Sequence, residues 1–176
     1  IKAAKKNLKK FKKADVKKFS IYDIPYKNKF DISFSIGVVH HLEFPEKAID
    51  KLVQATKPGG NVLVWLYGYE NMRIFIHILN PIRKILFSRA PLPLVRFMSY
   101  FPTFLLYIYI HLGITKLEYF KLLKRLNFTQ IKTIVFDQML PKTAKYYTKD
   151  EALKLLNHKG LHKHKIEWVN QCSWSI

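Results

Sequence analysis

Hydrophobic and polar positions predict a strand, a helix and a second strand between residues 30 and 67. Residues 30–36 (FDISFSI) alternate and are rich in β-forming side chains, which predicts a strand. Pro45 and Glu46 suit the first turn of a helix, where a missing N–H costs nothing and the helix dipole favours a carboxylate. That helix should stop at residues 57–60 (KPGG), and the apolar run NVLVWLY at residues 61–67 is typical of a strand buried on both faces of a parallel sheet. Together the three elements have the form of a βαβ crossover.

The other ordered segments lie on either side of this unit. Thr148 and Glu151 have the spacing of a capping box, so the last helix should begin there. The remaining patterns predict an amphipathic helix at residues 1–13, a strand at 16–21, a helix at 116–125, a short strand or extended arm at 131–136, and two strands at 166–169 and 173–176.

A long apolar stretch occupies the middle of the chain. Residues 72–87 are apolar with a few cations and are broken by Pro81, and residues 97–115 carry no formal charge, a length near that of a membrane span. Pro102, His111 and several tyrosines interrupt the second segment. We therefore favour a pair of helices that is buried against the rest of the fold or lies in a membrane interface. A helix that spans the membrane is the alternative.

The formal net charge of +19 is concentrated at the start of the chain, where residues 1–18 hold nine lysines and one acid. This pattern indicates a solvated helix face or attraction to an anionic membrane or nucleic acid. Nucleic acid is the less favoured partner, because no aromatic and basic stacking motif accompanies the lysines. The single cysteine, Cys172, excludes an internal disulfide and fits a reducing compartment, so we expect a cytoplasmic protein, with peripheral contact at the inner face of the membrane as the alternative.

The order and spacing of FDISFSIGVVHHLEFPEKAIDKLVQATKPGGNVLVWLYG at residues 30–68 resemble the middle of a class I S-adenosylmethionine-dependent methyltransferase of the type 11 kind. In that family a strand that begins Phe-Asp leads to a Val-His-His or Leu-His-His exit, a helix, a Lys-Pro-Gly-Gly turn and a buried strand. The resemblance implies an α/β fold, a Rossmann-like sheet with a helical insert after the fifth strand.

The resemblance also implies that the first two strands of the sheet are missing here. The chain begins at Ile1 within a predicted helix, and it contains no GxGxG loop, so we expect a fragment that alone binds the cofactor negligibly and is inactive. Because those two strands separate the third from the fourth, residues 16–21 should lack their usual neighbour. The expected parts are a partial cofactor-binding core (1–69), a helical insert or lid (70–128), and a C-terminal part of the core with a helix and antiparallel strands (129–176).

By resemblance, S-adenosyl-L-methionine should lie at the carboxyl ends of the strands. Ser20 aligns with an aspartate that accepts a hydrogen bond from the adenine amino group. Asp23 could take that role instead, or Ser20 could simply cap a turn. The predicted cofactor-binding residues are Ser20, Ile21, Tyr22, Ile36, Gly37 and Val38.

His40 and His41 follow the first strand of the crossover unit. One of them could act as a general base, since the ordinary pKa of histidine suits neutral pH, or both could have structural roles. Methyl transfer from a sulfonium requires chiefly proximity and an in-line approach, so a base is not obligatory. We predict no metal site, because no cysteine or acidic pair at ligand spacing surrounds the two histidines. Tyr67 and Tyr69, at the end of the buried strand, are the candidates for substrate contact.

The sequence therefore predicts methyl transfer from S-adenosylmethionine to a small or lipid-linked acceptor by an enzyme of which this chain is a part. The alternative is a non-catalytic membrane-surface or scaffold protein with a degenerate methyltransferase fold, which the lysine-rich start and the aromatic insert would suit.

Overall fold

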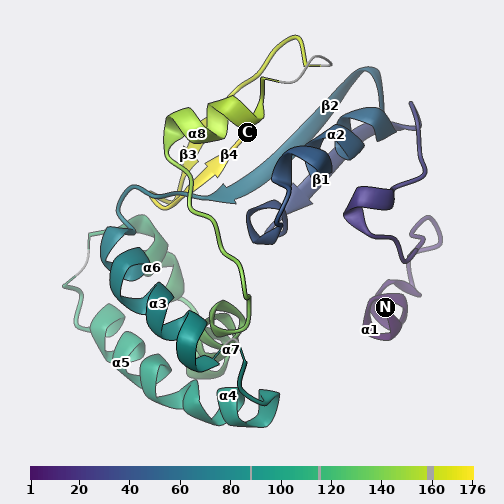
Figure 1. Cartoon of the computed structure of the whole chain (residues 1–176). Coiled ribbons are helices and arrows are strands. Elements are labelled where there is room, and N and C mark those ends of the chain that lie inside the picture. The colour runs from purple at the N-terminus through teal and green to yellow at the C-terminus, as the bar shows by residue number, and fades with distance from the viewer. Residues whose placement is uncertain (88, 115, 158–160) are drawn as a thin grey trace.

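The computed structural model describes residues 1–87, 89–114, 116–157 and 161–176 and divides into an α/β part and a helical layer (Figure 1). The sheet has the order β1-β2-β4-β3. Its strands are β1 (Phe30–Ile36), β2 (Thr56–Tyr67), β3 (Glu167–Val169) and β4 (Ser173–Ser175). β1 and β2 are parallel, whereas β4 runs antiparallel to both β2 and β3. This mixed sheet with helices agrees with the predicted α/β class.

The predicted crossover unit is confirmed. Helix α2 (Pro45–Ala55) begins at the predicted proline and connects the two parallel strands. β2 begins earlier than expected, at Thr56, which pairs with Phe30, while Asn61 pairs with Ile32. Residues 57–60 therefore loop out of the ladder, and Gly59 supplies the positive φ of +80° that the loop requires.

One face of the sheet is covered by α2 and by α8 (Lys149–Leu155). Thr148 caps α8 through the predicted box: its hydroxyl accepts from the Glu151 N–H and its own N–H donates to the Glu151 carboxylate. The core beneath the two helices consists of Val39, Ile49, Leu52, Val64, Leu66, Tyr147, Ala152, Leu156, Trp174 and Ile176.

The opposite face of β1 is open. The prediction that residues 61–67 are buried on both faces is corrected with it, because Leu63, which pairs with Phe34, is 39% exposed on the same face. Ile32, Phe34 and Ile36 are each more than 60% exposed. Their polar neighbours Ser33 and Ser35 are buried instead, and the Ser33 hydroxyl accepts a 2.7 Å hydrogen bond from Thr56. Side chains alternate between the two faces of a strand, and among the described residues no helix covers the apolar face of β1.

The N-terminal segment differs from its prediction. The amphipathic helix is short, α1 (Lys2–Leu8), buries no residue and lies apart from the sheet (Figure 1). The strand predicted at residues 16–21 is wrong. This segment pairs with no strand of the sheet as described, and the chain turns through a 3₁₀ helix, η1 (Ile21–Asp23). A strand forms only where a neighbour receives its backbone hydrogen bonds.

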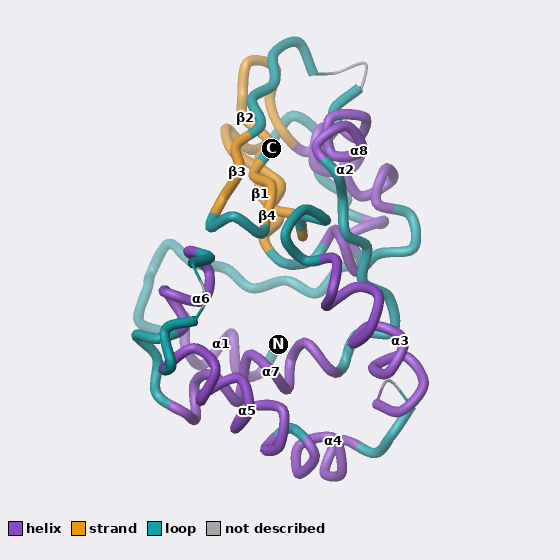
Figure 2. Tube along the Cα trace, turned by 90° about the vertical axis from the view of Figure 1, so that its left-hand side faces the viewer, coloured by secondary structure: helices purple, strands orange, loops and turns teal. Residues whose placement is uncertain are grey.

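The helical layer lies beyond the carboxyl end of β2. It consists of a helical segment with π turns, η3 (Phe75–Leu79), α3 (Asn80–Ile82) and η4 (Arg83–Phe87), followed by α4 (Leu92–Met98), α5 (Tyr100–His111), α6 (Glu118–Leu123) and α7 (Phe128–Met139). Figure 2, turned by 90°, shows the same separation of this layer from the sheet.

The strand predicted at residues 131–136 is also wrong, because these residues belong to α7. Asn127 and Gln130 form a second capping box, and Ile131 packs with Ile110 and Leu123 in a separate core. The helical layer therefore continues past residue 128. The division of the chain into three domains stays a prediction.

One helix of the described chain, Leu92–His111, is long and apolar enough to cross a membrane by length and composition. Within this 20-residue helix, a stretch of 18 residues has a mean hydropathy of 1.2, and 22% of that stretch is buried. A helix from the core of a soluble protein can pass the same test, although its residues are mostly buried.

Candidate functional site

A cavity of about 590 Å³ separates the carboxyl end of β2 from the helical layer. Trp65 and Tyr67 of β2 form its wall on the side of the sheet, and the helices supply mostly apolar side chains. Ligands of α/β proteins commonly bind at the carboxyl ends of parallel strands. The cavity is lined by Trp65, Tyr67, Asn71, Met72, Ile74, Phe75, Leu79, Ile82, Arg83, Phe87, Pro102, Leu106, Tyr109, Leu117, Tyr119, Phe120, Leu123, Ile134, Val135, Gln138, Met139, Tyr146, Cys172 and Ser173.

Four polar side chains gather at the sheet end of this cavity. The Gln138 amide donates a 2.6 Å hydrogen bond to the Tyr67 hydroxyl, and the Tyr67 ring stacks on Tyr146 with centroids 5.4 Å apart. Buried Arg83 donates to the Pro141 carbonyl at 2.5 Å and to the Asn80 side-chain oxygen at 2.6 Å. The cavity thus combines an apolar body with one polar end.

The charge states of these groups follow from their burial. Burial raises the pKa of Tyr67 and of Tyr146, and it raises the pKa of Tyr119 to about 12. The three phenols are therefore neutral at pH 7 and can donate hydrogen bonds. Burial lowers the pKa of Arg83, but a guanidinium remains charged at neutral pH. Among the described lining residues there is no acid, so this cation favours a polar or anionic group at this end.

His40 lies behind Tyr67 and not in the lining. It is fully buried, its ring centroid is 3.7 Å from that of Tyr67, and neither ring nitrogen has a hydrogen-bond partner within the described parts of the chain. Burial, helped by the nearby charge of His41, lowers the pKa of His40 to about 3. A histidine with so low a pKa is neutral at pH 7 and a weak base.

His41 is the better placed of the two to accept a proton. Its Nδ1 lies 2.8 Å from the Thr143 carbonyl, so Nδ1 carries the hydrogen and Nε2 keeps a lone pair. Burial lowers the pKa of His41, and the Thr143 carbonyl opposes this shift. His41 also lies outside the lining, with its ring centroid 5.5 Å from that of Tyr67. The role of a general base stays a prediction for both histidines.

Residues 141–147 form a segment that we call the connecting segment. It joins the loop of His40 and His41 to the carboxyl end of β2 by backbone hydrogen bonds. The Lys145 N–H donates to the His40 carbonyl at 2.8 Å, and the Tyr147 N–H donates to the Tyr67 carbonyl at 2.9 Å. The Tyr69 N–H in turn donates to the Tyr147 carbonyl at 2.9 Å. The segment runs from the helical layer to α8 (Figure 1), so it fixes the histidine loop, the end of β2 and Arg83 relative to one another.

The predicted cofactor-binding residues lie on the side of α2. The Ser20 hydroxyl accepts a 3.2 Å hydrogen bond from the Tyr22 N–H, so Ser20 caps η1. This agrees with the alternative prediction that Ser20 caps a turn. The Tyr22 hydroxyl accepts from the Phe44 N–H at 3.3 Å, which ties Ser20, Ile21 and Tyr22 to the loop after β1.

The second predicted cofactor segment directly follows β1. Gly37 has a φ of +75° and open space where a Cβ would stand, and its neighbours Ile36 and Val38 are exposed. Room for a ligand therefore exists at this strand end. Binding of S-adenosylmethionine by residues 20–22 and 36–38 stays a prediction.

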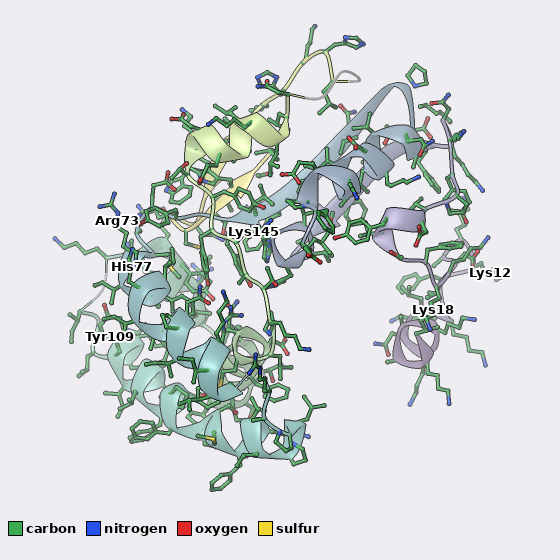
Figure 3. All side chains as sticks on the ribbon, viewed as in Figure 1. Lys12, Lys18, Arg73, His77, Tyr109 and Lys145 are labelled. Atoms are coloured by element: carbon green, nitrogen blue, oxygen red, sulfur yellow. The ribbon has the colours of Figure 1, made fainter. Side chains whose placement is uncertain are left out.

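The two predicted substrate residues differ in position. Tyr67 lines the cavity, whereas Tyr69 lies outside the lining and its hydroxyl is 3.2 Å from His77 Nε2. Figure 3 shows His77 on the outer side of the helical layer, near Arg73 and Tyr109.

Arg83, Gln138 and Tyr146 were not predicted as site residues from the sequence. Arg83 is one of three cations in the apolar run of residues 72–87, and only its burial distinguishes it from Arg73 and Lys84. Gln138 could not be placed because residues 131–136, in the middle of its helix, were predicted as a short strand or extended arm.

Comparison with known proteins gives two matches. Residues 1–64 match the family model described as "Methyltransferase domain". The chain is also 42% identical over 52 residues to the tRNA (carboxymethyluridine(34)-5-O)-methyltransferase of Arabidopsis thaliana, an alignment that covers 27% of this chain and 13% of that relative. These matches support the predicted class I S-adenosylmethionine-dependent methyltransferase over the first third of the chain. It spans only a small part of the length of the relative that it matches.

Proposed function

We propose that the protein transfers the methyl group of S-adenosyl-L-methionine to a small or lipid-linked acceptor held in the cavity beside Tyr67. The observation that carries the proposal is the cavity itself, about 590 Å³ in volume and lined mainly by apolar side chains at the end of a parallel strand. Cavities of this size and composition suit organic ligands of moderate size.

The polar end of the cavity would orient the acceptor. Tyr67 and Tyr146 can donate hydrogen bonds, and Arg83 supplies a positive charge. An acceptor with an apolar body and a polar or anionic head would therefore place its head against β2. Holding the nucleophile in line with the methyl group is the main requirement of this reaction.

The cofactor would supply a methyl group on a sulfonium. The open strand end at residues 36–38 fits such a group, since Gly37 leaves free space and Ile36 and Val38 offer exposed apolar surface. Residues 20–22 would contact its adenine end. His41, with its free Nε2, would accept a proton if the acceptor has one to lose.

A tRNA acceptor is the second candidate. It is favoured by the name of the Arabidopsis relative and by the nine lysines of residues 1–18. However, the alignment covers 13% of that relative, and an apolar cavity with a single cation offers little to a polyanion. We therefore favour the apolar acceptor.

The test uses the complete gene product, because the chain aligns with only 13% of the relative that it matches. The protein is incubated with S-adenosylmethionine carrying a tritiated methyl group and with either a membrane-lipid extract or total tRNA from the source cells. We expect label in the organic phase. Label in the tRNA alone would overturn the choice of acceptor, and label in neither fraction would favour the non-catalytic alternative.

A further inference from the structure

Six large apolar side chains form an exposed stripe along α4 and α5. They recur every three or four residues, which places them on one face of a helical rod. The rod of residues 92–111 has 20 residues and is about 30 Å long at 1.5 Å per residue. This outer stripe consists of Leu94, Phe97, Phe101, Leu105, Ile108 and Leu112.

The opposite face of the same rod is packed. Val95, Ser99, Thr103 and Ile110 are buried, and Ile110 belongs to the core that α5 shares with α7. The side chains of the outer stripe therefore do not contribute to the buried core of the helical layer. In Figure 1 and Figure 2, α4 and α5 form the rim of the molecule farthest from the sheet.

Along the part of the sequence that carries the outer stripe, all formal charges have one sign. Residues 71–117 contain no aspartate or glutamate, whereas the cations are Arg73, Arg83, Lys84, Arg89, Arg96 and Lys116. Arg89 lies just before the rod and Lys116 just beyond its end, and both are exposed. An apolar face about 30 Å long with cations at both ends matches the boundary between acyl chains and anionic headgroups.

We infer that the outer stripe docks this protein on an anionic lipid bilayer, with α4 and α5 lying in the plane of the membrane. A spanning orientation is disfavoured, because it would expose the packed face of the rod and separate Ile110 from α7. The inference is independent of methyl transfer, since it rests on the surface of the helical layer alone.

The cavity reaches solvent within the helical layer. Ile74, Leu79, Ile82 and Tyr109 line the cavity and are also exposed to solvent. A protein docked by its outer stripe could therefore draw an acceptor with an apolar body from the bilayer into the cavity. This extension rests on the proposed function, whereas docking itself does not.

Docking is tested by flotation of residues 1–176 with vesicles of phosphatidylcholine, with or without 30% phosphatidylglycerol, and without cofactor. We expect binding to the anionic vesicles at 0.15 M NaCl, and we expect at least half of it to persist at 1 M NaCl, because burial of apolar surface is not screened by salt. Complete release at 1 M NaCl would assign the binding to the lysines of the N-terminal segment. Figure 3 shows Lys12 and Lys18 of that segment on the far side of the molecule from Tyr109.

The matched variants are Phe97→Ser with Phe101→Ser, and Phe34→Ser with Ile36→Ser on the open sheet face. Both pairs remove two exposed apolar side chains, and circular dichroism checks their folding. We expect at least a tenfold loss of vesicle binding for the first pair alone. An equal loss for both pairs, or dimerisation through the outer stripe without vesicle binding, would overturn the inference.

A second measurement reports which surface contacts the vesicle and does not require a variant with reduced vesicle binding. An environment-sensitive fluorophore is attached at Phe101→Cys or at Phe34→Cys, each in a Cys172→Ala background that removes the single native cysteine. We expect a blue shift on anionic vesicles for the label at position 101 only. A blue shift confined to position 34 would assign the membrane contact to the sheet face and contradict the inference.

Discussion

The rings of His40 and Tyr67 lie almost in contact, with centroids 3.7 Å apart and ring planes inclined by 31°. His40 supports Tyr67 from within the protein, while the Gln138 amide holds the Tyr67 hydroxyl from the side of the cavity. Tyr67 is therefore fixed from two sides by residues that are far apart in the chain. This pairing gives His40 a role in orienting the wall of the cavity without requiring it to transfer a proton.

Acid should destabilise the protein through His40. Its pKa is about 3 in the folded state against an ordinary value of 6.5, so between these values the unfolded chain binds a proton that the folded chain excludes. The free energy of unfolding should therefore fall as the pH falls from 6.5 toward 3, by at most about 1.4 kcal/mol for each pH unit. Urea denaturation of the parent and of His40→Leu at pH 7, 6 and 5 checks this: the variant should gain relative stability as the pH falls. A difference that stays constant with pH would contradict the assignment.

Arg83, at the polar end of the cavity, should contribute to the free energy of unfolding of the protein. Arg83→Met leaves the Pro141 carbonyl and the Asn80 side chain without a buried partner, which should lower the free energy of unfolding by about 2 kcal/mol. Arg89→Met, at an exposed position, should change it by less than about 0.5 kcal/mol. Equal effects in urea denaturation would show that the hydrogen bonds of Arg83 contribute little.

The two glycines of the loop at residues 57–60, within β2, should respond differently to substitution. A Cβ on Gly60 would lie 2.6 Å from the Asp31 carbonyl oxygen and 2.7 Å from Thr56 Cγ2, so Gly60→Ala should destabilise the protein by about 2 kcal/mol. Gly59 has open space but a φ of +80°, and Gly59→Asn should cost less than about 1 kcal/mol, because asparagine tolerates this region. Thermal or urea denaturation that ranks the two variants in the reverse order would contradict the geometry.

The capping box of α8 offers a test of a feature predicted from sequence. Thr148→Ala removes the acceptor for the Glu151 N–H and should cost about 1 kcal/mol, whereas Thr148→Ser keeps an oxygen there and should cost much less. The comparison of both variants by urea denaturation checks the prediction, and similar losses for alanine and serine would be inconsistent with it.

Local signals explain what could be predicted from the sequence. The crossover unit and the start of α8 depend on alternation, on Pro45 and on the Thr148–Glu151 spacing, all within a few residues. The strand at residues 16–21 failed because a strand depends on a distant neighbour, which its own residues do not specify. At residues 131–136 the capping box at Asn127 and the packing of Ile131 outweighed the β-propensity of the segment.

The candidate site was predicted only in part, because most of its residues come from segments that are distant from one another in the sequence. Tyr67 follows a strong strand pattern, so its place at the strand end could be foreseen. Arg83, Gln138 and Tyr146 reach it from three other segments, and only the packing of α7 and the connecting segment brings them together.

If the acceptor occupies the cavity beside Tyr67, a bulky side chain that fills the cavity should block methyl transfer. Val135 of α7 lines the cavity, whereas Thr133 on the same helix is exposed and lies outside the lining. Val135→Trp and Thr133→Trp in the complete gene product add the same ring at the two positions, and denaturation curves check that both variants fold. We predict that Val135→Trp lowers kcat/KM for transfer into the lipid fraction at least tenfold with an unchanged KM for S-adenosylmethionine, while Thr133→Trp retains the parental rate. Parental kcat/KM for Val135→Trp would contradict the account.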